Sequence, residues 1–92
     1  MTAREPLITL YSTSNCGFCK MVADVLDGLG VVYTKAYLDG QSSGRHKASL
    51  RRRGITILAV PVLIVGDNIY RPSDLINELG QVKDTLPSLV GR

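Results

Sequence analysis

The first forty residues carry a pattern of apolar side chains that few folds can satisfy. Residues 7–11 (LITLY) form a largely apolar run of strand length, and residues 31–38 (VVYTKAYL) form a second run rich in β-branched and aromatic residues. Between them, apolar side chains recur at helical spacing on one face, as Phe18, Met21, Val22, Val25, Leu26 and Leu29. A strand, a helix and a strand joined by short connections predict a βαβ unit with two parallel strands.

Residues at both ends of this helix can satisfy the backbone groups that a helix end leaves unpaired. Ser14 or Asn15 can cap the start, and Gly30 can close the last turn. The rest of the chain divides in order into a loop over 39–44, a helix over 46–53 stopped by Gly54, a strand over 62–65, a hairpin turn at 66–68, a returning strand from 69–70 and a helix over 73–79 preceded by Pro72.

The resulting order of elements is β-α-β-α-β-β-α. It predicts an α/β fold in which helices cover both faces of a mixed four-stranded sheet, a three-layer α/β/α sandwich. At 92 residues the chain is predicted to be one domain, 1–92, with one core over about residues 7–80. Val82 and Leu86 could continue the apolar face of the last helix as far as Pro87, and residues 87–92 are predicted to be a loose tail.

The only two cysteines of the chain stand between the first strand and the helix, as Cys16-Gly17-Phe18-Cys19. A helix N-terminus carries partial positive charge and unpaired N–H groups, which favour a thiolate there. In such positions the thiol pKa falls from about 8.5 to roughly 3.5–7.5. A second thiol one helical turn away can attack a mixed disulfide formed by the first. The spacing therefore predicts a nucleophile and the thiol that resolves its intermediate.

Two other uses of the cysteines compete with this interpretation. As two small apolar side chains they would both be buried, but a helix start exposes at least one of them. A structural zinc site needs four ligands, whereas the chain offers two cysteines and the distant His46. No metal site is therefore predicted.

Composition limits the cellular setting. Charged residues make up 21% and apolar residues 45%, which is typical of globular proteins. No apolar run approaches the roughly 18 residues of a membrane span, and the run over 7–11 is too short for a signal peptide. Two cysteines are too few for a disulfide-stapled secreted scaffold. The chain is predicted to be cytoplasmic, where a CxxC pair more often does chemistry than holds a fold.

The net charge is +3, and the positive excess is concentrated in one segment. Its basic side chains are Arg45, His46, Lys47, Arg51, Arg52 and Arg53. A solvated helix face is the first interpretation, and a surface that attracts an acidic partner or an anionic thiol is the second. No aromatic residues interleave with these cations and no zinc-finger or RNA-binding motif is present, so no nucleic-acid partner is predicted.

Four local features stand in a characteristic order. They are residues 10–19 (LYSTSNCGFC), residues 30–33 (GVVY) before the second strand, Ala59-Val60-Pro61 before an apolar strand, and Ser73-Asp74-Leu75 at the start of the last helix. In these features the chain resembles the glutaredoxins of the thioredoxin-like superfamily, from about Leu7 to Leu79. The resemblance implies the thioredoxin-like fold and a thiol–disulfide oxidoreductase that reduces protein disulfides or mixed disulfides with a small thiol.

The resemblance also implies roles for individual residues. Cys16 is the catalytic nucleophile and Cys19 the resolving thiol. Pro61 is the family's cis-proline facing the dithiol, and the backbone of Val60 pairs with the substrate peptide or small thiol.

Further residues are implied to bind the small thiol. Ser73 and Asp74 match the positions that hold the γ-glutamyl end of glutathione, and a helix N-terminus suits a carboxylate. One of the three arginines over 51–53 could hold the other carboxylate. Phe18 either packs in the core or flanks the site as an exposed aromatic rim.

Departures from the family pattern leave the co-substrate open. Gly17-Phe18 replaces the Pro-Tyr of most glutathione-using relatives, Thr13 replaces a basic residue, and Tyr70-Arg71-Pro72 replaces a glycine pair. Mycoredoxins, which use mycothiol, share the Gly-aromatic pair and Pro72-Ser73. The glutaredoxin-like electron donors of ribonucleotide reductase, reduced directly by thioredoxin reductase, also lack glutathione-binding residues.

The last alternative is a non-enzymatic iron–sulfur glutaredoxin, in which a dimer shares a cluster held by Cys16 of each chain. Gly-Phe also occurs in iron–sulfur glutaredoxins, but there a serine stands at the position of Cys19. The prediction is a monomer without a bound cofactor, which uses glutathione or another small thiol as co-substrate and acts on disulfide-containing proteins.

Overall fold

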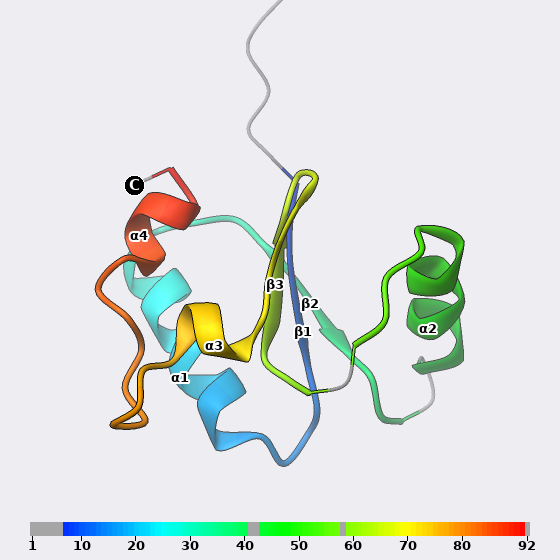
Figure 1. Cartoon of the computed structure of the whole chain (residues 1–92), viewed down its shortest axis with the longest axis horizontal. Coiled ribbons are helices and arrows are strands. Elements are labelled where there is room, and N and C mark those ends of the chain that lie inside the picture. Colours follow the sequence, from blue (N-terminus) through cyan, green and yellow to red (C-terminus); the bar gives the residue numbers. More distant parts are fainter. Residues whose placement is uncertain (1–6, 41–42, 58, 92) are drawn as a thin grey trace, which may run out of the picture.

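The computed structural model describes residues 7–40, 43–57 and 59–91, and these form a four-stranded sheet between helices (Figure 1). The strands are β1 (Ile8–Ser12), β2 (Thr34–Tyr37), β3 (Val62–Val65) and β4 (Asn68–Tyr70). The helices are α1 (Gly17–Gly28), α2 (Ser43–Arg52), α3 (Pro72–Leu75) and α4 (Leu86–Leu89). This is the predicted order of elements with a further short helix at the end.

The sheet is mixed, and its strand order is β2-β1-β3-β4. β1 and β2 are parallel, with Ser12 opposite Tyr37, whereas β3 is antiparallel to both β1 and β4. The βαβ unit and the mixed four-stranded sheet predicted from the sequence are therefore confirmed. The turn that joins β3 to β4 contains Gly66, whose φ of +61° favours glycine.

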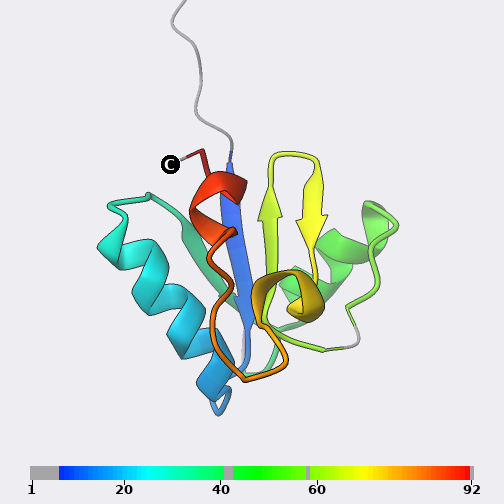
Figure 2. The same cartoon turned by 60° about the vertical axis from the view of Figure 1, so that its left-hand side comes forward.

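Alternate side chains of β1 and β3 enter two separate cores on the two faces of the sheet. On one face they meet α1, α3 and α4, and this core includes Leu10, Leu63, Val22, Leu26, Leu75 and Leu86. On the other face they meet α2, and this smaller core consists of Tyr11, Ala36, Leu50, Val62 and Ile64. Figures 1 and 2 show α1, α3 and α4 gathered on one side of the sheet and α2 alone on the other.

The end of α1 is built as predicted. Gly30 has a φ of +70°, and the N–H groups of Gly30 and Val31 donate to the carbonyls of Asp27 and Leu26. This pair of bonds is a Schellman motif, so closure at Gly30 is confirmed. The N–H of Val31 is used here and not in the sheet, and β2 over Thr34–Tyr37 is shorter than the predicted strand over 31–38.

α2 begins at Ser43 rather than at His46 and ends before Gly54, whose φ is +73°. Its last turn repeats the closure of α1, because the N–H of Ile55 donates to the carbonyl of Leu50 over 2.9 Å. Among the described side chains of this helix, Leu50 is the one buried in the sheet core. The other side chains described along α2 are largely basic and exposed, so this helix presents a cationic outer face.

The start of α1 differs from the prediction. The N-cap residue is Cys16, whose sulfur accepts a hydrogen bond from the N–H of Cys19, and not Ser14 or Asn15. The buried face consists of Cys19, Val22, Ala23 and Leu26, whereas Phe18 and Met21 are 48% and 37% exposed. The helix is therefore rotated relative to the predicted face, with Cys19 inside. This rotation leaves Phe18 as an exposed aromatic side chain beside Gly80, where an added β-carbon would lie 3.5 Å from the ring.

The predicted helix over 73–79 is wrong after Leu75. Ile76 has an extended backbone and pairs with Val82 in an antiparallel bridge, so Val82 does not prolong the helix. The carboxamide of Asn77 accepts hydrogen bonds from the N–H groups of Leu79 and Gln81, at 2.9 and 3.0 Å. These local bonds form a turn that competes with helical hydrogen bonding.

The described residues after position 86 are not the predicted loose tail. They contain α4, with Pro87 in its first turn, where the missing N–H of proline costs nothing. Leu86 and Val90 are 0% and 7% exposed in the core beside α1, so the core extends past the predicted limit at residue 80. Arg92 of that tail, residues 41–42 of the predicted loop, Leu58 and residues 1–6 lie outside the described residues.

Candidate active site

A disulfide joins Cys16 and Cys19 where β1 leads into α1. Their Cα atoms are 5.2 Å apart, within the usual range for disulfides. The N–H of Cys19 donates to Sγ of Cys16 over 3.1 Å, so this sulfur does what an N-cap oxygen does in other helices. A thiolate at Cys16 would receive this hydrogen bond together with the positive end of the α1 dipole.

The two sulfur-bearing residues differ in access. Cys16 is partly exposed and is followed by the exposed Gly17, whereas Cys19 is 3% exposed. An incoming disulfide can therefore reach Cys16 and not Cys19. This difference fits the roles of nucleophile and resolving thiol that the resemblance implied.

The loop between β1 and Cys16 is held by a carboxylate that follows β2. The backbone N–H of Ser14 donates to both oxygens of Asp39, at 3.0 and 3.1 Å, and the Ser14 hydroxyl donates to Oδ2. The bond from the hydroxyl and then the bond from the N–H hold the pKa of Asp39 below its usual value. Ser14 thus binds Asp39 instead of capping α1.

Replacing Asp39 by asparagine is expected to lower the free energy of unfolding at neutral pH but not in acid. A carboxyl group whose folded-state pKa lies below its unfolded value of about 3.9 stabilises the fold above that pH. The stabilisation is lost as the pH falls through the folded-state pKa. The difference between wild type and Asp39→Asn should therefore be constant above about pH 5 and shrink below about pH 4. Urea unfolding at a series of pH values measures it.

Asp24→Asn is the matched control for this experiment. Asp24 is exposed on α1 and has no side-chain hydrogen bond in the described part of the chain. Its replacement should leave the pH dependence of unfolding close to that of the wild type. A stability loss in Asp39→Asn that persisted unchanged in acid would contradict the role of the Asp39 charge.

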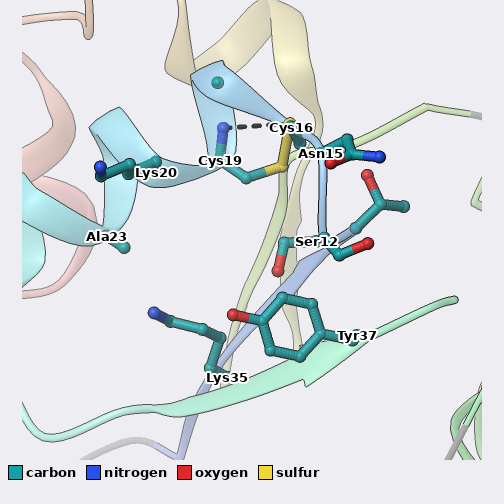
Figure 3. A pocket seen from close by; sticks show the side chains of 11 residues that line it. Ser12, Asn15, Cys16, Cys19, Lys20, Ala23, Lys35 and Tyr37 are labelled. Atoms are coloured by element: carbon teal, nitrogen blue, oxygen red, sulfur yellow. Dashed lines mark hydrogen bonds between the residues drawn. A yellow bond between two sulfur atoms is a disulfide. The ribbon is translucent and has the colours of Figure 1, made fainter. Parts of the chain in front are cut away.

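A cavity of about 490 Å³ lies beside the disulfide, between α1 and the strands β1 and β2 (Figure 3). Three elements supply polar side chains to its wall: Ser12 of β1, Lys20 of α1, and Lys35 and Tyr37 of β2. Ser12 is 2% exposed, and its hydroxyl has no hydrogen-bond partner in the described structure. The cavity therefore brings a buried hydroxyl and two ammonium groups to the redox pair.

Sequence reasoning missed Ser12, Lys35 and Tyr37 as residues of the site. Strand alternation carried the signal, because residues two apart share one face of a sheet. Leu10 lies opposite Lys35 and Ser12 opposite Tyr37 in the parallel pair, and Leu10 packs in the core beneath α1. Polar residues at the ends of β1 and β2 on that face must lie near the start of α1.

The residues predicted to bind the substrate lie before β3 and in α3. The Val60–Pro61 peptide bond is cis, as the resemblance implied, and Pro61 is buried next to β3. Ser73 and Asp74 are exposed in the single turn of α3. The carboxylate of Asp74 accepts a hydrogen bond from the backbone N–H of Arg71 over 3.0 Å, which caps this turn.

Arginine side chains join some of these segments. Nη1 of Arg71 donates to the carbonyl of Thr56 over 3.0 Å and so ties the start of α3 to the segment before Pro61. The arginines over 51–53 are exposed, and Arg53 donates to the carbonyl of Gly66 over 3.5 Å. Within the described residues no hydrogen bond connects Ser73 or the side chain of Asp74 to the cysteines.

Two further observations concern metals and membranes. No group of three or more His, Cys, Asp or Glu side chains in the described residues could hold a metal ion. None of the helices in the described part of the chain has the length and hydrophobicity needed to cross a membrane.

A disulfide between cysteines one helical turn apart, at the strand-to-helix junction of a mixed sheet, is the site of a thiol–disulfide oxidoreductase. The chain belongs to the glutaredoxin family, because the family model described as Glutaredoxin matches residues 8–70. No curated protein sequence matches the chain significantly.

Similar solved structures show the thioredoxin-like fold of this family. The NrdH-redoxin of Escherichia coli, described as a glutaredoxin-like protein with a thioredoxin-like activity profile, is 22% identical, with a TM-score of 0.60; the match covers 89% of this chain and 92% of that one. A glutaredoxin of Archaeoglobus fulgidus is 20% identical, with a TM-score of 0.64 and coverage of 95% and 88%. A buckwheat glutaredoxin in complex with glutathione is 29% identical, with a TM-score of 0.53 and coverage of 70% and 58%.

Proposed function

We propose that this oxidoreductase reduces disulfides in proteins and mixed disulfides between proteins and a small thiol, with Cys16 as the nucleophile. The observation that carries the proposal is the position of the Cys16 sulfur, which is accessible and accepts a hydrogen bond from the N–H of Cys19 at the start of α1. The Cys16 thiolate attacks one sulfur of the substrate disulfide, and the other sulfur leaves as a thiol. The mixed disulfide is then resolved by Cys19 or by a free small thiol.

The substrate is proposed to lie along the segment before β3. The backbone of Val60 pairs with the substrate, and Pro61 borders the dithiol. Phe18 supports this assignment because its ring is 48% exposed one residue before Cys19, where it offers an apolar contact. Ser73 and Asp74 are proposed to meet a carboxylate of the small thiol.

The small thiol is proposed to be glutathione or a related thiol such as mycothiol. Glutathione is bound by the buckwheat relative, which is 29% identical to this chain. The protein is proposed to act as a monomer in the cytoplasm.

A second candidate is a redoxin that a thioredoxin reductase recharges directly and that donates electrons to ribonucleotide reductase. The observation in its favour is the geometry of α3. This helix has a single turn, and its N-terminus is already capped by the carboxylate of Asp74. A glutathione carboxylate would have to share that site. The Escherichia coli relative with a thioredoxin-like activity profile is an NrdH-redoxin.

The consumption of NADPH with a small disulfide substrate separates the two candidates. One arm contains glutathione and glutathione reductase, and the other contains thioredoxin reductase alone. Turnover with glutathione supports the first candidate, and turnover only with thioredoxin reductase supports the second. Silence in both arms would direct the test to mycothiol, and a brown colour of anaerobically purified protein would instead indicate an iron–sulfur carrier.

A further inference from the structure

Among the described polar side chains that line the cavity, Ser12 is the one that is buried and has an unpaired hydroxyl. Ser12 is the last residue of β1 and is 2% exposed. Its hydroxyl has no hydrogen-bond partner in the described structure. A buried hydroxyl without a partner destabilises a fold, and most buried polar groups in proteins are paired. Its presence beside a redox disulfide therefore points to a partner that forms in another redox state.

Two cavity residues change their chemistry with redox state, Cys16 and Cys19, and Cys19 is the buried one of the two. Cys19 and Ser12 line the same cavity, and Cys19 is 3% exposed. In the oxidised protein its sulfur is bonded to Cys16 and carries no proton. After reduction the same sulfur is a thiol, and it must lose its proton before it can attack a mixed disulfide on Cys16. Burial disfavours this ionisation unless a donor or a positive charge compensates it.

The charged side chains that line the cavity are all positive. α1 contributes Lys20 and Cys19, its N-cap contributes Cys16, and β2 contributes Lys35 and Tyr37. No Asp or Glu side chain is among the described residues that line it. Neither lysine side chain has an ion-pair or hydrogen-bond partner within the described residues. Figure 3 shows the Lys35 ammonium group and the Tyr37 hydroxyl on β2, across the cavity from the disulfide.

We propose that Ser12 is a positioning residue for the resolving step, in which its hydroxyl donates a hydrogen bond to the Cys19 thiolate while Lys35 supplies positive charge. The Cys19 thiol gives up its proton to solvent through the open cavity. The Cys19 thiolate then attacks Sγ of Cys16 in the mixed disulfide. A bond forms between the two cysteine sulfurs, and the bond from Cys16 to the substrate sulfur breaks. The substrate sulfur leaves with the electron pair and takes up a proton, so the chain is oxidised by two electrons and the substrate is reduced by two.

A single turnover with the aryl disulfide dithiobis(nitrobenzoate) tests this inference without any biological reductant. When reduced protein meets one equivalent of the reagent, the Cys16 thiolate releases a first coloured thionitrobenzoate. The attack of Cys19 on the mixed disulfide releases the second. The first phase depends on reagent concentration and the second does not, so stopped-flow absorbance separates the two steps.

Ser12→Ala is expected to leave the first phase unchanged and to slow the second about tenfold or more, the usual effect of losing a hydrogen bond to a charged group. The pH midpoint of the second phase should move upward, because the Cys19 thiolate loses a donor. In Ser12→Thr the second phase should be close to that of the wild type, because the hydroxyl is kept. In Ser12→Val it should stay slow, because valine has the shape of threonine but no hydroxyl. Equal second phases in the Thr and Val variants would overturn the proposal.

A purely structural role for Ser12 predicts a different pattern. Removing an unpaired buried hydroxyl should leave the melting temperature of the oxidised protein unchanged or higher. A second phase that slowed only in parallel with the first, or with a fall in the melting temperature of every variant, would overturn the proposal. The outcome is independent of the reductant assigned above, because neither glutathione nor a reductase is present.

Lys35→Gln provides a test that does not alter the buried core, because Lys35 is exposed on β2. It is expected to raise the pH midpoint of the second phase. Lys47→Gln, with the same change of charge on α2 across the sheet, should not. An unchanged midpoint in Lys35→Gln, or an equal shift in both variants, would show that the cavity does not set the ionisation of Cys19.

Discussion

Replacing Cys16 by serine is expected to abolish both the reduction of protein disulfides and the reduction of mixed disulfides with a small thiol. Cys19 is 3% exposed and cannot replace Cys16 as the attacking group. A serine hydroxyl is not ionised near neutral pH and does not attack a disulfide. In both assays, with insulin and with a mixed disulfide as substrates, the rate should fall to that of the added reductant alone.

The serine variant is also suited to separate catalysis from folding. Serine is a good N-cap residue, so its hydroxyl can take over the hydrogen bond that the Cys16 sulfur accepts from the N–H of Cys19. Its stability should match that of reduced wild type, which likewise has no disulfide. Cys16→Ala, which has no acceptor, should lose about 1 kcal/mol more. Activity above the reductant background in a folded Cys16→Ser protein would refute the role of Cys16.

The first half of the chain could be predicted because its signals are local. The apolar runs on both sides of one helix specify β1, α1 and β2, and Gly30 marks the end of α1 with a conformation that suits glycine. The rotation of α1 could not be derived from the same pattern. Phe18 and Met21 lie at helical spacing, but the face that packs in the core passes through Cys19, Val22, Ala23 and Leu26, and Phe18 and Met21 lie outside it.

The prediction for the C-terminal part was wrong because the structure there depends on contacts that the spacing of apolar residues does not reveal. The side chain of Asn77 forms a turn, and Ile76 pairs with Val82, so apolar residues at helical spacing belong to an extended bridge. Leu86 and Val90 are buried by a core that is assembled from distant segments. The site was likewise predicted only in part. The spacing of Cys16 and Cys19 identifies them in the sequence, but nothing local distinguishes Ser12 from the other serines.

Replacing Cys19 by serine is expected to separate the two activities that Cys16 supports. A resolving thiol held one helical turn from the mixed disulfide acts at an effective concentration far above the millimolar level of a free thiol. Without Cys19, a mixed disulfide with a protein can be resolved only by an external thiol. The rate of protein-disulfide reduction should therefore fall by about a hundredfold or more. Exchange with a small thiol does not need Cys19 and should stay within about twofold of wild type. Mass spectrometry should detect the trapped mixed disulfide on Cys16.

Cys19→Ala is the control that this experiment needs, because a serine at a site that is 3% exposed buries a new hydroxyl. The alanine variant removes the thiol without adding a polar group, and both variants keep the backbone N–H that donates to Cys16 Sγ. If both lose protein-disulfide reduction and keep small-thiol exchange, the loss comes from the missing resolving thiol. Unchanged reduction of protein disulfides in both variants would show that Cys19 takes no part in turnover, and the cavity around it would then have no function in resolution.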